Sequence, residues 1–285
     1  MRLFACQRCG NALHFDNTTC VSCGARLGYL PERFVLSVVE TWGGGGGGAA
    51  GPGLWALAAP EQPRVFCANA WQEACNWLVP MPEAPDAPTP LCEACRHNRT
   101  VPDLTVAGNL PRWRKLELAK RRLYYSLMRW DLPRPDRTQD PAQGLCFDFL
   151  ADSTDASGQL QRVLTGHDRG VITINIAEAD DAEREQRRTA MREPYRTLVG
   201  HFRHEVGHYY FDRLVVDRNR LDAARELFGD ETADYAAALQ RHYQLGPPPN
   251  WRDHFISGYA AAHPWEDFAE TFAHYLHMVD ALDTA

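Results

Sequence analysis

The stretch Phe202-Arg203-His204-Glu205-Val206-Gly207-His208-Tyr209-Tyr210-Phe211 contains two histidines spaced four residues apart. On a helix this spacing places the imidazoles of His204 and His208 on one face, where both can bind one zinc ion. Glu205 is rotated by about 100° from His204 around the helix, so it can reach a zinc-bound water without being a ligand. Zinc lowers the pKa of such a water toward about 7, and the glutamate can accept its proton as a general base. This H-E-x-x-H pattern predicts a hydrolytic zinc site.

The neighbours of this motif predict a largely buried helix over residues 195–216. Its apolar and aromatic members are Phe202, Val206, Tyr209, Tyr210, Phe211 and Leu214. Polar side chains inside such a helix need hydrogen-bond partners or a metal ion. Gly207 leaves room for the backbone of another element. The alternative is a pair of histidines on a polar stripe without metal, because the short motif also occurs by chance.

A hydrolytic zinc site needs a third protein ligand. The extended pattern H-E-x-x-H-x-x-G-x-x-H does not continue here, because Phe211 and Leu214 occupy its later positions. The better source is a helix that Pro264 begins, in which Glu266 and Glu270 fall four apart on one face. We expect Glu266 to be the third ligand and Glu270 to hydrogen-bond the free nitrogen of a ligand histidine. The reverse assignment is the alternative.

Tyr259, in a loop seven residues before Glu266, is the candidate donor to the oxyanion that forms during hydrolysis. Three histidines compete for that role: His242, His254 and His263. Glu231 and Asp234 are alternative metal ligands, although we favour structural roles for them at a helix start. His201 is expected behind the ligands or at the surface, and His274 and His277 are expected in the core or in capping roles.

The nine cysteines form two groups of four and one single residue, Cys146. The first group contains two C-x-x-C pairs, ten residues apart: Cys6, Cys9, Cys20 and Cys23. Four thiolates close a tetrahedral site without an open position, so this pattern predicts a structural zinc ribbon, with rubredoxin-like iron as the alternative. A looser second group predicts a second structural zinc: Cys67, Cys75, Cys92 and Cys95. Complete sets of four fit a reducing compartment better than a disulfide framework, and we expect Cys146 to be buried in a strand.

The chain divides into an N-terminal cysteine-bearing module over 1–105 and a larger domain over 106–285. The module contains a glycine-rich insertion at about 43–53 and a proline-rich loop at 80–90. Strands are predicted over 145–150 and 171–176, the second amphipathic as a substrate-pairing edge strand would be. Helices are predicted over 112–130, 180–192, 195–216, 221–244 and 264–280. The fold class expected is α+β, with a mainly helical C-terminal domain and a small β-sheet.

The composition is that of a globular protein, with 45% hydrophobic and 24% charged residues among 285. A formal net charge of −7 argues against nucleic acid or an anionic membrane as the main partner. The basic helix over 112–130 could contact nucleic acid, but a solvated helix packed on the next domain is favoured. No apolar run is long enough to span a membrane and no signal peptide is evident, so we expect a cytoplasmic protein.

These motifs together resemble a bacterial family of zinc-binding metallopeptidases with an N-terminal zinc-ribbon domain. The resembling segments cover most of the chain: 6–23, 27–31, 75–80, 119–123, 165–168, 200–210, 228–235 and 263–277. A weaker likeness is to gluzincins, including the anthrax lethal factor type. There a tyrosine precedes the glutamate ligand and an E-x-x-A-E helix follows the H-E-x-x-H helix, which Tyr259, Glu266, Ala269 and Glu270 match.

The sequence thus predicts a zinc-dependent peptidase of gluzincin type with one catalytic and one or two structural zinc ions. Its expected partner is a peptide or protein substrate, and the zinc ribbon could recruit a protein partner or shield the cleft. Two alternatives belong to other classes: a non-catalytic zinc scaffold, and a zinc-ribbon module that binds nucleic acid or protein. The base Glu205 argues against a scaffold, and the low overall basicity argues against nucleic acid.

Overall fold

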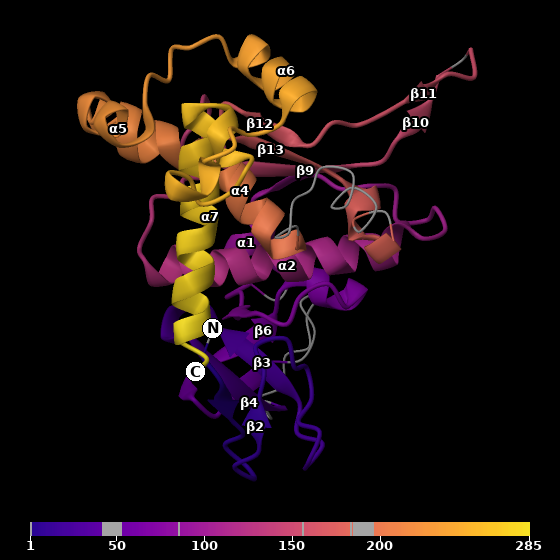
Figure 1. Cartoon of the computed structure of the whole chain (residues 1–285). Helices are drawn as coiled ribbons and strands as arrows, with labels where there is room; N and C mark the ends of the chain where they lie inside the picture. Colours follow the sequence, from indigo (N-terminus) through magenta and orange to yellow (C-terminus); the bar gives the residue numbers. More distant parts are fainter. Residues whose placement is uncertain (1, 42–52, 85, 156, 183, 185–196) are drawn as a thin grey trace. The chain divides into compact units, whose positions relative to one another are not determined.

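The computed structural model describes residues 2–41, 53–84, 86–155, 157–182, 184 and 197–285 (Figure 1). The glycine-rich insertion, apart from residue 53, and most of the helix expected over 180–192 lie outside these residues. The chain forms two compact units, each built from separated segments. The first comprises Met1–Asn98, Asp103–Leu132 and Asp280–Ala285, and the second comprises Arg99–Pro102 and Pro133–Val279.

The first unit contains a β-hairpin and a five-stranded antiparallel sheet. Strands β1 (Phe4–Ala5) and β2 (Ala12–Leu13) form the hairpin that carries the first cysteine pair. The sheet has the sequential order β3-β4-β5-β6-β7. Its strands are Leu27–Leu30, Val35–Thr41, Leu54–Ala56, Ala59–Phe66 and Leu78–Pro80. Its first and last strands also approach each other, because Tyr29 and Trp77 form an isolated parallel bridge.

Short helical turns and one long helix complete the first unit. The turns are η1 (Pro31–Arg33), η2 (Ala68–Gln72) and α1 (Glu93–Arg96). The long helix α2 (Asn109–Arg129) lies close to its predicted bounds and buries one apolar face. Lys120 and Arg121 of α2 are also buried, with Lys120 paired to Glu117 at 2.9 Å. The expectation that the basic residues of this helix are solvated is therefore wrong for these two, whose polar partners lie inside the unit.

The second unit is built on a four-stranded sheet of order β12-β13-β9-β8. Its strands are β8 (Asn98–Thr100), β9 (Cys146–Leu150), β12 (Gly166–Asp168) and β13 (Val171–Asn175). β13 runs parallel to β9 and antiparallel to β12, which forms one edge. A ribbon of β10 (Ser153–Thr154) and β11 (Leu160–Gln161) projects from this unit (Figure 1). The two predicted strands are confirmed as β9 and β13, and Ile172 and Ile174 are buried as their alternation indicates.

The helices of the second unit follow the sheet in sequence. They are η3 (Ile176–Ala179), α4 (Leu198–Phe211), the π-helical η4 (Asp212–Val216), α5 (Leu221–Phe228), α6 (Tyr235–Leu245), η5 (Trp251–Asp253), η6 (Ala260–Ala262) and α7 (Pro264–Leu282). The single helix predicted over 221–244 is wrong, because Gly229, with a φ of 94°, ends α5. Asp234 then caps α6 by accepting a hydrogen bond from the backbone N–H of Ala237 (3.0 Å).

The whole chain is therefore α+β, as expected, with helices and several sheets. The narrower expectation of a mainly helical C-terminal domain is not confirmed, because that unit also carries the four-stranded sheet and the ribbon. Within the described residues, no helix combines the length and the apolar character needed to cross a membrane.

Candidate metal centre and catalytic cleft

The site is built where α4 and α7 cross at very short range. A Cβ atom at Gly207 would lie 2.8 Å from the Cα of Ala269 and 3.1 Å from its carbonyl oxygen. Only glycine on α4 and a small residue on α7 permit this approach. Figure 1 shows α4 and α7 side by side. Because Glu266 and Glu270 flank Ala269 on α7, the crossing places both carboxylates beside the histidines of α4.

Three side chains converge at this crossing: His204, His208 and Glu266. The Nε2 atoms of the two histidines are 3.3 Å apart. The Oε2 atom of Glu266 lies 3.0 Å from Nε2 of His204 and 3.6 Å from Nε2 of His208. Ligands bound tetrahedrally to zinc at 2.0–2.1 Å would be separated by about 3.3 Å, so the spacing of these donor atoms fits zinc.

The hydrogen bonding of these atoms also fits a bound cation. Oε1 of Glu266 accepts a hydrogen bond from the Tyr235 hydroxyl (2.6 Å). Oε2 is buried and accepts no hydrogen bond from any described residue. Nδ1 of His204 lies 2.7 Å from Oε1 of Glu270 and is placed to donate to it. The Nε2 lone pair of a neutral His204 then points toward Oε2 of Glu266. Both atoms are hydrogen-bond acceptors, so a neutral His204 provides no proton between them.

The electrostatics of the cluster favour a bound cation as well. Burial works against a charged His204, but the carboxylates of Glu266 and Glu270 raise its pKa well above the usual value. Burial alone would raise the pKa of Glu266, whereas its interactions with His204 and His208 lower it well below the usual value. The same negative potential attracts a divalent metal ion, which competes with the proton for these groups.

Glu205 lies beside this cluster and is held by a histidine that the sequence left without a definite role. Nε2 of His201 is 3.1 Å from Oε1 of Glu205, and Nδ1 of His201 contacts the buried carboxylate of Glu178. Burial lowers the pKa of His201, but the charges of Glu178 and Glu205 outweigh it and raise the pKa to about 9. Glu178 accepts a second hydrogen bond from the Thr165 hydroxyl (2.5 Å). His201, which is itself held by Glu178, therefore restrains the carboxylate of Glu205.

A cleft of about 450 Å³ opens over these groups. The edge strand β12 and its flanks line this cleft together with His204, Glu205, His208 and Glu266. The aromatic residues Tyr235, Tyr259 and Trp265 line it as well. The ring of His167 in β12 stacks on that of His208, with centroids 6.5 Å apart. Burial and the nearby His208 lower the pKa of His167 to about 4, so its ring is neutral at physiological pH.

The structure brings Tyr259 into the cleft, with its ring centroid 5.9 Å from that of His204. Burial, with the charge of Glu266, raises the pKa of Tyr259, so its phenol keeps its proton and can donate a hydrogen bond. Tyr235 is a site residue that the sequence analysis missed. Its hydroxyl reaches Glu266 from the first residue of α6, thirty-one positions away along the chain, and no local pattern indicates that contact.

The rival candidates have other partners. Glu231 is bound by Arg225 through two N–H groups (2.9 and 2.5 Å), and Asp234 caps α6, which supports structural roles for both acids. His263 uses both ring nitrogens in backbone contacts, at 3.0 Å to the Ala233 carbonyl and 3.1 Å from the Trp265 N–H. His242 and His254 are not among the described residues that line the cleft, although the ring of His242 contacts Tyr259. Nδ1 of His274 contacts the backbone carbonyl of Glu270 (2.8 Å).

The first cysteine group also has metal-site geometry. The Sγ atoms of Cys6 and Cys23 are 3.7 Å apart, as are those of Cys9 and Cys20. A disulfide requires about 2.0 Å, whereas four sulfurs bound tetrahedrally to zinc at about 2.3 Å are separated by about 3.8 Å. The donor spacing therefore fits zinc and excludes disulfides between these pairs.

The second cysteine group comes together with the same spacing. Its members are Cys67, Cys75, Cys92 and Cys95. All four are buried, and the Sγ atoms of Cys75 and Cys92 are 3.8 Å apart. The backbone N–H group of Trp77 donates to Sγ of Cys75 (3.4 Å), and that of Cys92 donates to Sγ of Cys67 (3.3 Å). Cys146 is buried in β9, as expected.

These three groups of donor atoms describe a zinc-binding protein, and comparisons with known proteins define its family. A family model described as "Putative zinc-binding metallo-peptidase" matches residues 109–285, and a zinc-ribbon domain model matches residues 3–106. The chain belongs to this family of zinc-binding metallo-peptidases, and the resemblance seen in the sequence is confirmed.

Relatives and solved structures add less about function. The chain is 45% identical over 286 residues to uncharacterized proteins of Mycobacterium bovis and Mycobacterium tuberculosis. Each match covers 100% of this chain and 75% of the relative. No solved structure matches the chain. The family implies a peptide or protein substrate, and its name and the cysteine groups support zinc binding.

Proposed function

We propose that the protein is a zinc-dependent peptidase of gluzincin type. His204, His208 and Glu266 would hold the catalytic zinc, and Glu205 would act as general base. One observation carries this proposal: two partly buried Nε2 atoms and a buried carboxylate oxygen converge at 3.0–3.6 Å in the lining of a cleft, and a second carboxylate, that of Glu205, lines the same cleft. A non-catalytic scaffold has no need for that second carboxylate.

Zinc bound at this site would supply Lewis acidity, lowering the pKa of a water ligand and polarising a peptide carbonyl. Glu205 accepts the proton of the attacking water and delivers it to the leaving amine as the carbon–nitrogen bond breaks. His201 holds this carboxylate in place during both transfers. The Tyr259 phenol donates a hydrogen bond to the oxyanion, because its raised pKa keeps the proton on the ring.

Two further residues orient the ligands. Glu270 receives the Nδ1–H of His204, which directs Nε2 into the site and increases its basicity. This geometry supports Glu266 rather than Glu270 as the ligand, because Glu266 lies on the Nε2 side. Tyr235 fixes the other oxygen of Glu266. Glu270 and Tyr235 thus set the direction of the donor atoms of His204 and Glu266.

The substrate class follows from the cleft wall. β12 is the terminal strand of its sheet in the described structure and pairs only with β13. Its outer backbone N–H and C=O groups are available to an extended peptide, which can add to the sheet edge. The sequence analysis expected the strand over 171–176 to be the substrate-pairing edge strand. That strand is β13, which lies inside the sheet, and the edge strand is its neighbour β12.

The N-terminal part would have a structural and recruiting role. We propose one structural zinc in each four-cysteine group, and a ribbon module over 1–105 that binds a protein partner or substrate ahead of a peptidase domain over 106–285. Helix α2 lies beyond this sequence boundary but clusters with the first unit. Nine free cysteines, eight of them in metal-type groups, fit a reducing cytoplasmic location.

Hydrolysis of a quenched fluorescent peptide library by zinc-loaded protein tests this function. We expect turnover by the wild type and a fall of about 10²–10⁴-fold in Glu205→Gln, which keeps the ligands but removes the base. Glu226→Gln, an exposed position on α5, is the matched control and should retain full activity. Zinc retention without turnover by the wild type against any peptide would instead indicate the non-catalytic scaffold.

A further inference from the structure

Asp212 is a cleft residue to which the proposed mechanism assigns no task. It lies one helical turn after His208, where α4 ends and the π-helical η4 begins. Its side chain is partly buried and lines the cleft. In the described part of the chain this carboxylate makes neither a hydrogen bond nor an ion pair. Helical turns of π type are frequently found at functional sites.

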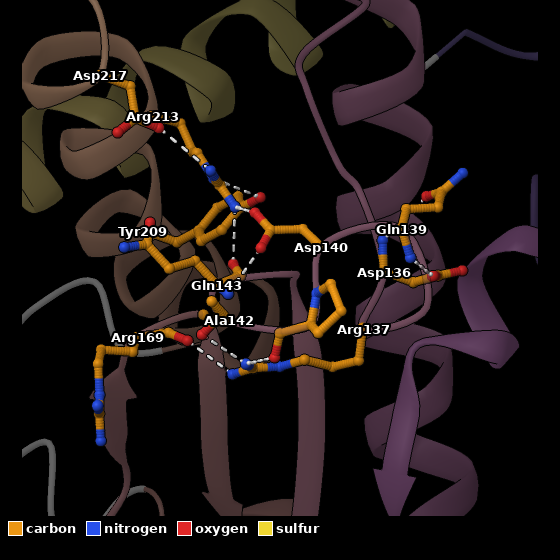
Figure 2. A network of polar contacts seen from close by, with 12 residues as sticks. Asp136, Arg137, Gln139, Asp140, Ala142, Gln143, Arg169, Tyr209, Arg213 and Asp217 are labelled. Carbon is orange, nitrogen blue, oxygen red and sulfur yellow. Dashed lines mark hydrogen bonds and ion pairs between the residues drawn. The ribbon is translucent and has the colours of Figure 1, made fainter.

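The adjacent cation does not neutralise Asp212. Figure 2 shows the Arg213 guanidinium bound elsewhere, to Asp140, to Asp217 and to the Gln143 carbonyl. Its Nε–H also donates to the Tyr209 hydroxyl (3.1 Å). Arg213 therefore already has two carboxylate partners, Asp140 and Asp217. Asp212 is a third carboxylate near this single cation, so the local charge remains negative.

The other acids of the cleft all have partners. Glu266 faces the two ligand histidines, and Glu205 faces His201. Asp168 and Arg169 form a pair at 3.4 Å on the rim, with side chains 78% and 80% exposed, where solvent screens their field. Burial, with the charge of Asp217, raises the pKa of Asp212, and the charges of Arg213 and His208 offset the desolvation of this anion only in part. An incoming cation would remove that cost.

Aromatic side chains that line the same cleft as Asp212 fit a cation as well. Phe211 and Trp265 both line this cleft, with their ring centroids 6.5 Å apart, and Trp265 is 39% exposed. A carboxylate next to an exposed aromatic ring can bind an ammonium or guanidinium group through charge and cation–π attraction. His208 and Asp212 are four residues apart, about 6 Å along the helix axis, and an extended peptide advances about 3.3 Å per residue.

We propose that Asp212 forms a subsite for a cationic group of the substrate, located within two residues of the scissile bond. The ligand is a lysine or arginine side chain or a free α-amino group, which share this chemistry. The inference rests on the proposed peptidase function, because it takes the metal as the reference point of the bound peptide. Among the extended peptides that can add to the edge strand β12, this subsite would favour those with a basic group near the scissile bond.

Hydroxamates anchor on zinc without turnover, so they test the subsite separately from catalysis. Amino-acid hydroxamates carrying Lys, Gln or Glu would be prepared in two series that extend from the metal in opposite directions. Calorimetry on zinc-loaded wild type should show one series in which Lys binds about tenfold tighter than Gln, and Glu binds weakest. Asp212→Asn should abolish that preference, and Asp212→Glu should keep it. Asp222→Asn, at an exposed position on α5 outside the cleft, is the matched control and should leave it unchanged.

Acetylation of the α-amine distinguishes the two sources of the cation. If the Lys hydroxamate still binds more tightly than the Gln hydroxamate after acetylation, the cation is the lysine side chain. If the alanine hydroxamate with a free α-amine binds more tightly than its acetylated form, the cation is the N-terminus. Equal binding of Lys and Gln in both series, with no effect of acetylation, would overturn the proposal while leaving the metal site intact. An equal loss in Asp212→Asn and Asp222→Asn would also overturn it. Failure of every hydroxamate to bind would contradict the metal site itself.

Discussion

Replacing Gly207 by alanine sets two physical effects against each other at the crossing of α4 and α7. Alanine is favoured over glycine inside a helix by about 1 kcal/mol. The added Cβ, however, would lie 2.8 Å from the Cα and 3.1 Å from the carbonyl oxygen of Ala269, which are backbone atoms that cannot rotate away. Overpacking of this kind costs about 1–3 kcal/mol, and contact with backbone places it at the upper end.

We therefore expect Gly207→Ala to lower the free energy of unfolding by about 2 kcal/mol, the difference between these two effects. Separation of the helices also moves Glu266 away from His204, so zinc affinity should fall. Urea unfolding after mild chelation gives the stability, and competition with a zinc-binding dye gives the affinity. Gly166→Ala is the matched control, because a Cβ there meets no atom within 4 Å.

A second variant sharpens this test. Adding Ala269→Gly to Gly207→Ala removes only the third contact, at 3.2 Å, and leaves the two closer backbone contacts in place. The double variant should therefore recover little stability. A Gly207→Ala protein as stable as the wild type, with unchanged zinc affinity, would refute the close crossing on which the site geometry depends.

Three other perturbations probe the support around the site. Glu270→Gln should weaken zinc binding by about 10–100-fold in dye competition, because the Nδ1–H of His204 loses its charged acceptor; an unchanged affinity would mean that Glu270 does not orient the ligand. Tyr259→Phe should lower kcat by about 10²–10³-fold with little change in KM, and equal kcat values would exclude this tyrosine as the oxyanion donor. Thr197→Ala should cost about 1 kcal/mol of stability in urea unfolding, since its hydroxyl caps α4 at the Gly200 N–H (3.0 Å), and a loss below experimental error would show the cap to be dispensable.

The parts of the fold that the sequence predicted are those with a local pattern. The four-residue spacing of His204 and His208, and of Glu266 and Glu270, places each pair on one helix face whatever the rest of the chain does. Alternating apolar residues predicted β13, and the C-x-x-C pairs predicted grouped thiolates. Gly207 predicted a close approach of another backbone, although the sequence did not identify Ala269 as its partner.

The parts that were missed depend on contacts distant in sequence. β6 contains Ala59-Pro60-Glu61-Gln62-Pro63, which reads as a loop, and it is a strand because β5 and β7 pair with it. The hydrogen bond from Tyr235 to Glu266 and the contact of Glu178 with His201 link different elements, so neither has a local signature. The π-helical turn at Asp212 likewise has no sequence pattern that distinguishes it from a continuing α-helix.

The most direct test of the account is the zinc content of purified protein, measured by elemental analysis. Three donor groups predict about three zinc ions per chain in the wild type. His204→Ala and Glu266→Ala should each retain about two, because the two cysteine groups do not depend on these residues. Loss of one ion in both variants would support Glu266 as the third ligand beside the two histidines. A full zinc content in both would contradict the metal centre and leave the protein as a zinc-ribbon binding module.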